Sequence, residues 1–486
     1  MENDKEMETA ERGMLAMARY LKLSMVLILI GLVSGLFIVF GSSQYSIAII
    51  CTGILFAVII MQFIYRQTVV FIEPFFLFSL MYLTTCFAMW YILAQNFSNN
   101  DFINAVTYET DFSTLLNKAS IYYLIGYICA LIGYRIVPTG KWNTLKWENK
   151  KQLSDGAIKT GLILLFIIAA ANFFYNVYIF SIGKIVNYFK SMALRSYEFE
   201  TGGTTIGYNF AYIGMYFLTF YYLRKKKSFN AGYFILMFFS TLILASTGRI
   251  FQTLSFVVTV IGIWYLYTMH TSIKNCNRKV VLLGAALFCA GLFFYVFRSF
   301  SSIVSSYQME VSTLRTIQAL VLNLMNVAFN RGYVVNVSLM PKILDSSIND
   351  IGLLHGESLF SSLNAFSTGL LNFDFPSTSV LIKQTWFSEV AGGNLPPTAV
   401  GEMYMNFGII GIIGGMFLIG VGAKLLYNCF IRRQTFFTTI IYLKISIDFF
   451  FVYPKNDFSN FPLMSIAFFI FVYVIAHISS YIWETE

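Results

Sequence analysis

The chain has little of what metal proteins and disulfide-rich proteins use to build their sites. Only 12% of its 486 residues are charged, six are cysteines and three are histidines. The cysteines are scattered and form no Cys-x-x-Cys pair, so neither a disulfide framework nor a zinc site is indicated. With three histidines, a histidine-based metal centre is not expected either. We therefore expect no metal and no cofactor.

Charge within the apolar segments is also scarce, which bears on transport. Lys444 and Asp448 lie four residues apart, a spacing at which they can neutralise each other on one helix. There is no series of buried acids of the kind that a proton-coupled pump carries. Nor do two halves repeat with broken helices at matching positions. These absences weaken a transporter interpretation without excluding it.

Long apolar runs dominate what is present. Apolar residues make up 57% of the chain and aromatic residues 18%, a composition that predicts an all-α polytopic membrane protein. About twelve segments are long and apolar enough to span a bilayer as helices. They lie near 22–41, 45–65, 72–95, 119–138, 158–180, 206–223, 231–247, 250–269, 280–297, 397–423, 435–453 and 460–481.

Lysine and arginine indicate the topology. They gather in alternate connections, as in the run from Arg224 to Lys227, and the positive-inside rule assigns those connections to the cytoplasm. Both termini are then cytoplasmic. The acidic start and the lack of a small-residue cleavage site predict an uncleaved first helix. The net charge of +9 therefore reflects topology and needs no nucleic-acid partner.

The opposite, external side holds the longest connection. Residues 1–297 carry nine predicted spans, 298–396 form a large external loop, and 397–486 carry three further spans. Within the loop, 312–331 reads as an amphipathic helix with Asn323, Asn326 and Asn330 on one face. Amides on one face suit a hydroxyl-rich ligand, because an amide both donates and accepts. The same stripe also fits the wet face of a surface helix.

Arginines on the external side are a second signal, because arginine is usually biased toward the cytoplasm. Arg249 ends Ser246-Thr247-Gly248-Arg249, which is nearly the whole connection between two spans, and so lies at the membrane surface. A guanidinium binds phosphate oxygens in pairs and stays protonated, so several at headgroup depth suit a phosphorylated lipid. Interfacial anchoring or pairing with acids is the alternative. The external arginines are Arg195, Arg249, Arg298, Arg315 and Arg331.

The stretch from Gly392 to Gly408 re-enters the membrane after the loop. Its sequence predicts a helix capped by Asn394, with Pro396 or Pro397 in the first turn. The free N–H groups of that turn would then offer a phosphate site. Glu402 follows at the edge of the hydrocarbon, where an unpaired carboxylate is costly, so it is either functional or a snorkelling acid.

These residues resemble a known family. The chain looks like the bacterial O-antigen and capsule repeat-unit polymerases (the Wzy type) in three features. These are the 392–408 stretch, with Gly-Gly followed by Pro-Pro-Thr-x-x-Gly-Glu-x-Tyr-x-Asn-Phe-Gly, the 246–249 hairpin, and the layout of spans. The resemblance implies a GT-C-like fold in the bacterial cytoplasmic (inner) membrane. It implies transfer of a growing glycan from undecaprenyl pyrophosphate onto a second lipid-linked repeat unit on the outer face. A chain-length regulator is a further candidate partner.

The residues can be given roles in such a reaction. A leaving pyrophosphate develops negative charge, which fixed cations stabilise without a metal. The acceptor hydroxyl needs a base. The candidates are Arg249, Glu402 and His355 for catalysis, Arg195, Arg249, Arg298 and Arg331 for pyrophosphate, and Glu389, Tyr404, Asn406, Asn323 and Asn326 for the glycan. For His355 a plain surface role is the alternative. Aromatic residues such as Trp386 can stack on sugars or can simply be buried.

Two other functions stay open. An O-antigen ligase would use the same donor with a lipid A core acceptor, and it is favoured if an arginine–histidine arrangement in the long loop is essential while Pro396–Glu402 is not. A flippase or transporter of lipid-linked oligosaccharide would instead need a hydrophilic path and alternating access.

Overall fold

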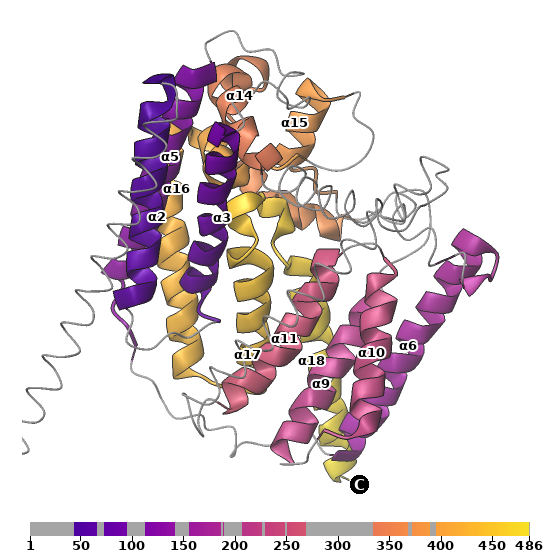
Figure 1. Ribbon diagram of the computed structural model, residues 1–486. Helices are drawn as coiled ribbons and strands as arrows, with labels where there is room; N and C mark the ends of the chain where they lie inside the picture. Colours follow the sequence, from indigo (N-terminus) through magenta and orange to yellow (C-terminus); the bar gives the residue numbers. More distant parts are fainter. Residues whose placement is uncertain are drawn as a thin grey trace, which may run out of the picture. The chain divides into compact units, whose positions relative to one another are not determined.

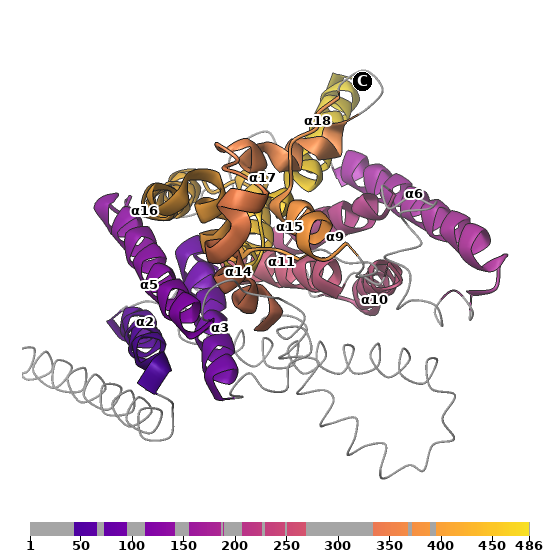
Figure 2. The ribbon, with the colours of Figure 1, turned by 90° about the horizontal axis from the view of Figure 1, so that it is seen from above.

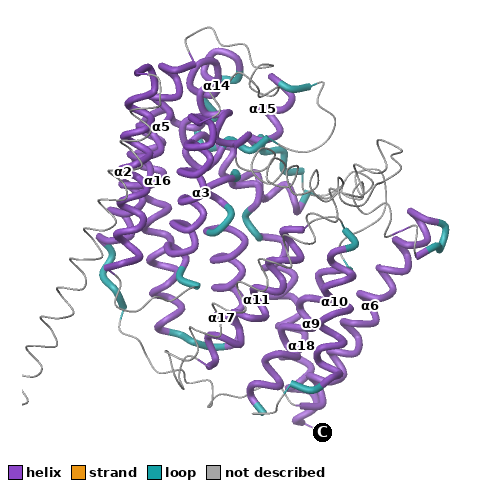
Figure 3. Tube along the Cα trace, in the orientation of Figure 1, coloured by secondary structure: helices purple, strands orange, loops and turns teal. Residues whose placement is uncertain are grey.

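The computed structural model describes residues 43–65, 72–94, 112–140, 155–185, 188, 207–225, 229–247, 250–268, 334–367, 372–388 and 395–485. In these residues all regular structure is helical, without a strand (Figure 3). Seven of the described helices are long and apolar enough to cross a membrane. The chain is therefore a polytopic membrane protein, as its composition predicts.

The seven helices match seven predicted spans, those at 45–65, 72–95, 119–138, 158–180, 397–423, 435–453 and 460–481. The predicted spans at 206–223, 231–247 and 250–269 also form helices, but these are shorter or less apolar than the seven. The predicted spans 22–41 and 280–297 and the predicted helix 312–331 lie outside the described residues. The total of twelve thus stays a prediction.

The chain divides into two compact units, each built from separate stretches of sequence. Unit 1 combines residues 1–139, 327–426 and 449–461. Its long helices are α2 (Ser46–Tyr65), α3 (Pro74–Ala94), α5 (Phe112–Ile136) and most of α16 (Thr398–Arg432). Both α3 and α5 pack against α2, and these helices run side by side in both views (Figures 1 and 2).

Glycine lets α5 and α16 approach each other closely. A Cβ built on Gly420 of α16 would lie 1.9 Å from the carbonyl oxygen of Ala130 on α5. A Cβ on Gly133 of α5 would lie 2.1 Å from the carbonyl oxygen of Phe417. Backbones in such contact gain packing energy that larger residues prevent, as is usual for helix pairs in membranes.

One end of unit 1 carries three further elements, which we call the cap: α14 (Val335–Asp350), the 3-10 helix η4 (Glu357–Phe366) and α15 (Thr378–Trp386). They lie at one end of α5 and α16 (Figure 1), and α14 packs against α3 and α5. The cap is the second part of the predicted external loop. Two short 3-10 helices, η6 (Tyr453–Lys455) and η7 (Phe458–Asn460), pack against α3 and η4 respectively.

The helix α16 is not continuous. Phe407 has φ −140° and ψ 15°, and Gly408 has φ 62° and ψ −145°, a conformation that only glycine adopts readily. A Cβ on Gly415 would lie 2.2 Å from the sulfur of Met403, although these residues would be about 18 Å apart along a straight helix. The segment 398–406 therefore folds back against the longer segment that follows. The predicted span 397–423 thus contains a break at Phe407–Gly408 that the sequence did not predict.

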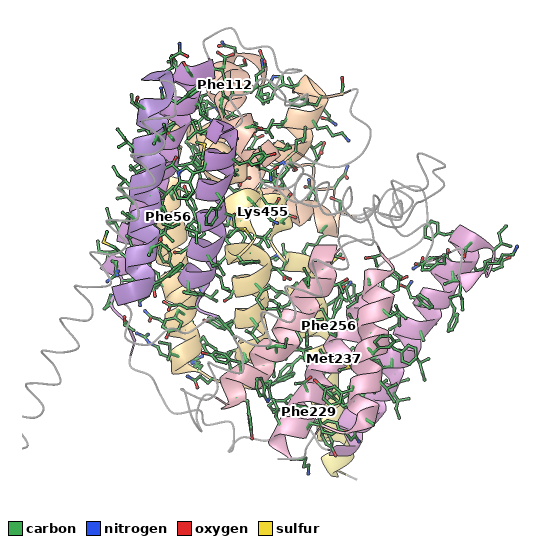
Figure 4. The ribbon with its side chains drawn as sticks, viewed as in Figure 1. Phe56, Phe112, Phe229, Met237, Phe256 and Lys455 are labelled. Carbon is green, nitrogen blue, oxygen red and sulfur yellow. The ribbon has the colours of Figure 1, made fainter. Side chains whose placement is uncertain are left out.

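Unit 2 combines residues 140–326, 427–448 and 462–486. Its described helices are α6 (Asp155–Ser181), α9 (Tyr208–Arg224), α10 (Ala231–Ala245), α11 (Ile250–Thr268), α17 (Phe436–Lys444) with most of the π-helix η5 (Ile445–Phe450), and α18 (Leu463–Thr485). Here α9 packs against α6, α10 and α11. Phe256 of α11, labelled in Figure 4, contacts the rings of Tyr212 and Tyr216 on α9.

The charged residues of unit 2 confirm one prediction. Lys444 and Asp448 form an ion pair, and both side chains are nearly buried. Ser255 on α11 donates a hydrogen bond to the Asp448 carboxylate, and the Lys444 ammonium lies 5.9 Å from the ring centre of Tyr212 on α9. The pair thus neutralises itself while tying α17 and η5 to two neighbouring helices.

Candidate functional site

The start of α16 differs from its prediction. The helix begins at Thr398, after both prolines, and Thr398 has a positive φ of 68°. Its hydroxyl lies 3.1 Å from the Tyr123 hydroxyl and accepts a hydrogen bond from the Gly401 N–H at 3.4 Å. The first residues of the helix are buried. The prediction of an outward-facing phosphate site at this N-terminus is therefore wrong, and Asn394 lies outside the described residues.

The break in α16 instead holds a turn of the cap. Because the helix stops at Phe407, the carbonyls of Met405 and Asn406 need other donors. The N–H of Leu354 donates to Met405 O at 3.0 Å, and the N–H of His355 donates to Asn406 O at 3.1 Å. The Gly356 N–H donates to Asn406 Oδ1 at 3.0 Å. We call residues 351–358 the anchored turn.

Strained backbone shapes this turn. His355 has φ 48° and Gly356 has φ 92°, so both lie in the left-handed region. Glycine tolerates that region, whereas histidine is there at a cost that the surrounding hydrogen bonds offset. The His355 side chain is exposed. The turn therefore presents an imidazole on a backbone that hydrogen bonds hold in place.

Glu402 connects the anchored turn to two other segments. Its side chain is 0% exposed. Ser358 Oγ donates to Glu402 Oε1 at 3.0 Å, and the Phe458 N–H reaches both carboxylate oxygens, at 3.2 and 3.0 Å. The amide of Asn406 donates to Ser358 Oγ at 2.7 Å and to the Glu402 carbonyl at 2.8 Å. A buried carboxylate with these partners joins α16, η4 and η7.

A second buried acid, Asp457, holds the start of α15. Its side chain is 1% exposed. Asp457 Oδ2 accepts from Ser377 Oγ, Thr378 Oγ1 and the Ser379 N–H, all within 3.1 Å. The N-terminus of a helix favours a negative charge, so the position suits a carboxylate. Asp457 is also close enough to Glu402 for the two carboxylates to interact.

The structure brings together three of the predicted site residues. Glu402 and Asn406 lie under the anchored turn, and His355 lies on it. Tyr404 points elsewhere: it is buried, and its ring stacks on Tyr122 of α5 with centroids 6.1 Å apart. The remaining candidates, Arg195, Arg249, Arg298, Arg331, Glu389, Asn323 and Asn326, lie outside the described residues.

Sequence reasoning missed the contribution of residues 453–458. Asp457 and the Phe458 N–H complete the cluster, and the Tyr453 hydroxyl lies beside the Glu402 carboxylate. Lys455, labelled in Figure 4, places a cation on the same segment, and its carbonyl accepts from Asn336 Nδ2 at 2.8 Å. The available signal was a polar run, Lys-Asn-Asp, between two apolar spans.

The chemistry open to this site is proton transfer by an exposed side chain. The His355 imidazole is exposed, whereas the Glu402 carboxylate is shielded and already hydrogen-bonded. Among the described residues, no group of three or more His, Cys, Asp or Glu side chains could hold a metal ion. Of these two residues, His355 is therefore the one that a ligand can reach, and Glu402 is the one that the surrounding chain encloses.

Comparison with protein-family models, with curated proteins and with solved structures gives no match.

Proposed function

We propose that this membrane protein is a glycosyltransferase that polymerises lipid-linked oligosaccharide repeat units. The donor is a glycan on undecaprenyl pyrophosphate, and the acceptor is a single repeat unit on a second carrier lipid. The reaction takes place on the outer face of the bacterial cytoplasmic membrane and builds an O-antigen or capsule. Undecaprenyl pyrophosphate is the leaving group, and both termini of the chain are cytoplasmic.

The observation that carries this proposal is the presentation of His355. Its side chain is exposed, its backbone is held at φ 48°, and its turn is hydrogen-bonded to the break in α16. A general base must reach the proton that it removes and keep a fixed direction toward it. The exposed side chain and the held backbone of His355 support this role, at the end of unit 1 that the sequence assigns to the external face.

Glu402 takes a different part from the base that the sequence suggests. Its carboxylate is fully buried and is occupied by Ser358 and Phe458, so no acceptor hydroxyl reaches it in this conformation. By fixing Ser358 it holds the turn that carries His355. We therefore assign Glu402 as a positioning residue for His355.

Fixed cations stabilise the leaving pyrophosphate in this proposal. Arg249 is the first candidate, because the sequence predicts a short hairpin that places its guanidinium at headgroup depth, and Arg195, Arg298 and Arg331 are the others. Glu389, Asn323 and Asn326 are candidates for binding sugar hydroxyls. These assignments rest on topology and on the resemblance to the polymerases.

The test is complementation of a gene deletion in the host. Surface glycans are separated on a gel after expression of the wild type, His355→Ala, or Glu357→Ala as a matched exposed control in η4. We expect the wild type and Glu357→Ala to restore a ladder, and His355→Ala to leave single repeat units. A normal ladder with His355→Ala would remove this residue from the reaction.

The deletion strain itself separates the three functions. Loss of the ladder with single repeat units still transferred indicates a polymerase. Intact polymer that stays on its carrier lipid indicates a ligase, and lipid-linked single units on the cytoplasmic face indicate a flippase. Either of the last two results would overturn the proposal.

A further inference from the structure

The cap contains an aromatic side chain that its own packing does not fully cover. Trp386 is the last residue of α15 and is half-buried. Its indole Nε1–H donates to Asp350 Oδ2 at 2.7 Å, and the Lys342 ammonium lies 5.7 Å from the ring centre. Asp350 and Lys342 both belong to α14. The indole therefore lies along the surface of that helix, where Asp350 contacts its N–H edge and Lys342 lies over its ring plane.

This arrangement has the chemistry of a sugar-binding surface. An indole offers a flat apolar face to the C–H groups of a sugar ring, while its polar edge keeps a hydrogen bond. The Asp350 side chain is exposed, and the indole bond uses only one of its two carboxylate oxygens. A carboxylate oxygen accepts from sugar hydroxyls, and an ammonium donates to them. Holding the ring in advance lowers the entropy that binding costs.

The position of Trp386 relates it to the anchored turn. α14 ends at Asp350, where the Ile351 and Gly352 N–H groups both donate to the Ser347 carbonyl. The chain then runs directly into His355. His355 follows Asp350 by five positions, so their Cα atoms are at most about 18 Å apart. An oligosaccharide of a few sugar rings is long enough to contact both.

We propose that Trp386, Asp350 and Lys342 form a subsite that binds a sugar ring of the repeat unit. The inference rests on the proposed function, which supplies the oligosaccharide, and adds where that substrate is held. A purely structural role, in which the Trp386–Asp350 bond only joins α14 to α15, is the alternative. The sugar-binding role and the structural role predict different results for a variant that keeps an aromatic ring but lacks the indole N–H.

The experiment measures binding by the full-length protein in lipid nanodiscs. The probe is the single repeat-unit oligosaccharide, without lipid, released by mild acid from the carrier lipid of the deletion strain. Calorimetric titration compares the wild type with Trp386→Phe, Trp386→Leu and Asp350→Asn. We expect Trp386→Leu to weaken binding about ten-fold, and Trp386→Phe to weaken it only about three-fold because it keeps a ring.

Two outcomes would overturn the subsite: a wild type that does not bind the probe, or a Trp386→Leu variant that binds as tightly as the wild type. If Trp386→Leu does not fold, Asp350→Asn decides the question. Asp350 is exposed, and the subsite requires at least about three-fold weaker binding for this variant.

The ladder on the gel and the titration are independent measurements. If the protein binds the probe through Trp386 but its deletion strain has the glycans expected of a ligase or a flippase, the subsite stands and the proposed reaction is refuted. A polymerase whose Trp386→Leu variant binds normally loses only the subsite.

Discussion

Replacing Glu402 by alanine separates a positioning role from a catalytic one. The change removes the acceptor of the Ser358 hydroxyl and of the Phe458 N–H, where the replaced side chain was fully buried. Each donor left without a partner costs about 1–3 kcal/mol, so the two together cost about 2–6 kcal/mol. That is a large part of the 5–15 kcal/mol typical of a folded protein. At about 2 °C per kcal/mol, the melting temperature should fall by about 4–12 °C.

The assay is thermal melting of the detergent-solubilised protein, followed by the loss of its monodisperse chromatographic peak. Glu357→Ala is the matched control, since Glu357 is exposed in η4 and should melt like the wild type. Glu402→Gln keeps the shape and one acceptor oxygen, so it should lie between them. A Glu402→Ala variant with the same melting temperature as Glu357→Ala would refute the positioning role. If that stable variant also made no polymer, Glu402 would be the base.

Three further outcomes follow from the structure and the sequence. Asp448→Asn leaves the Lys444 ammonium without its counter-charge and should cost about 3–5 kcal/mol, while Asp448→Leu combined with Lys444→Met should melt close to the wild type. Gly420→Val should lower the melting temperature because its Cβ would lie 1.9 Å from a facing carbonyl oxygen; Gly422→Val, with nothing within 4 Å, is the control. Arg249→Ala should abolish the glycan ladder while leaving an inserted protein, and Arg249→Lys should restore it only in part, because a point charge lacks the bidentate fork.

The membrane helices could be predicted because their signal is local. A run of apolar residues long enough to cross a bilayer predicts a helix whatever the rest of the chain contains. The Lys444–Asp448 pair could be predicted for the same reason, since both residues lie on neighbouring turns. Helix spacing alone brings their side chains together.

The candidate site was only partly predictable because its contacts are distant in sequence. Glu402 was identified as an acid near the membrane edge, but its partners Ser358 and Phe458 are 44 and 56 residues away. Neither position carries a distinctive signal of its own. The reversal at Phe407–Gly408 was missed as well, because Phe-Gly inside an apolar run is also compatible with an unbroken helix.

Assembly of the cap must wait for a late part of the chain to be made. The anchored turn and the first part of α16 leave the ribosome before the helix α17. Phe458, whose N–H donates a hydrogen bond to Glu402, is synthesised 56 residues after Glu402. At synthesis rates of about 5–20 residues per second, that interval lasts about 3–11 s. During that interval Glu402 lacks the hydrogen bond from the Phe458 N–H, and η4 of the cap cannot yet pack against η7. A chain arrested just before Phe458 should therefore leave the cap open to protease, whereas one extended past Asn460 should protect it.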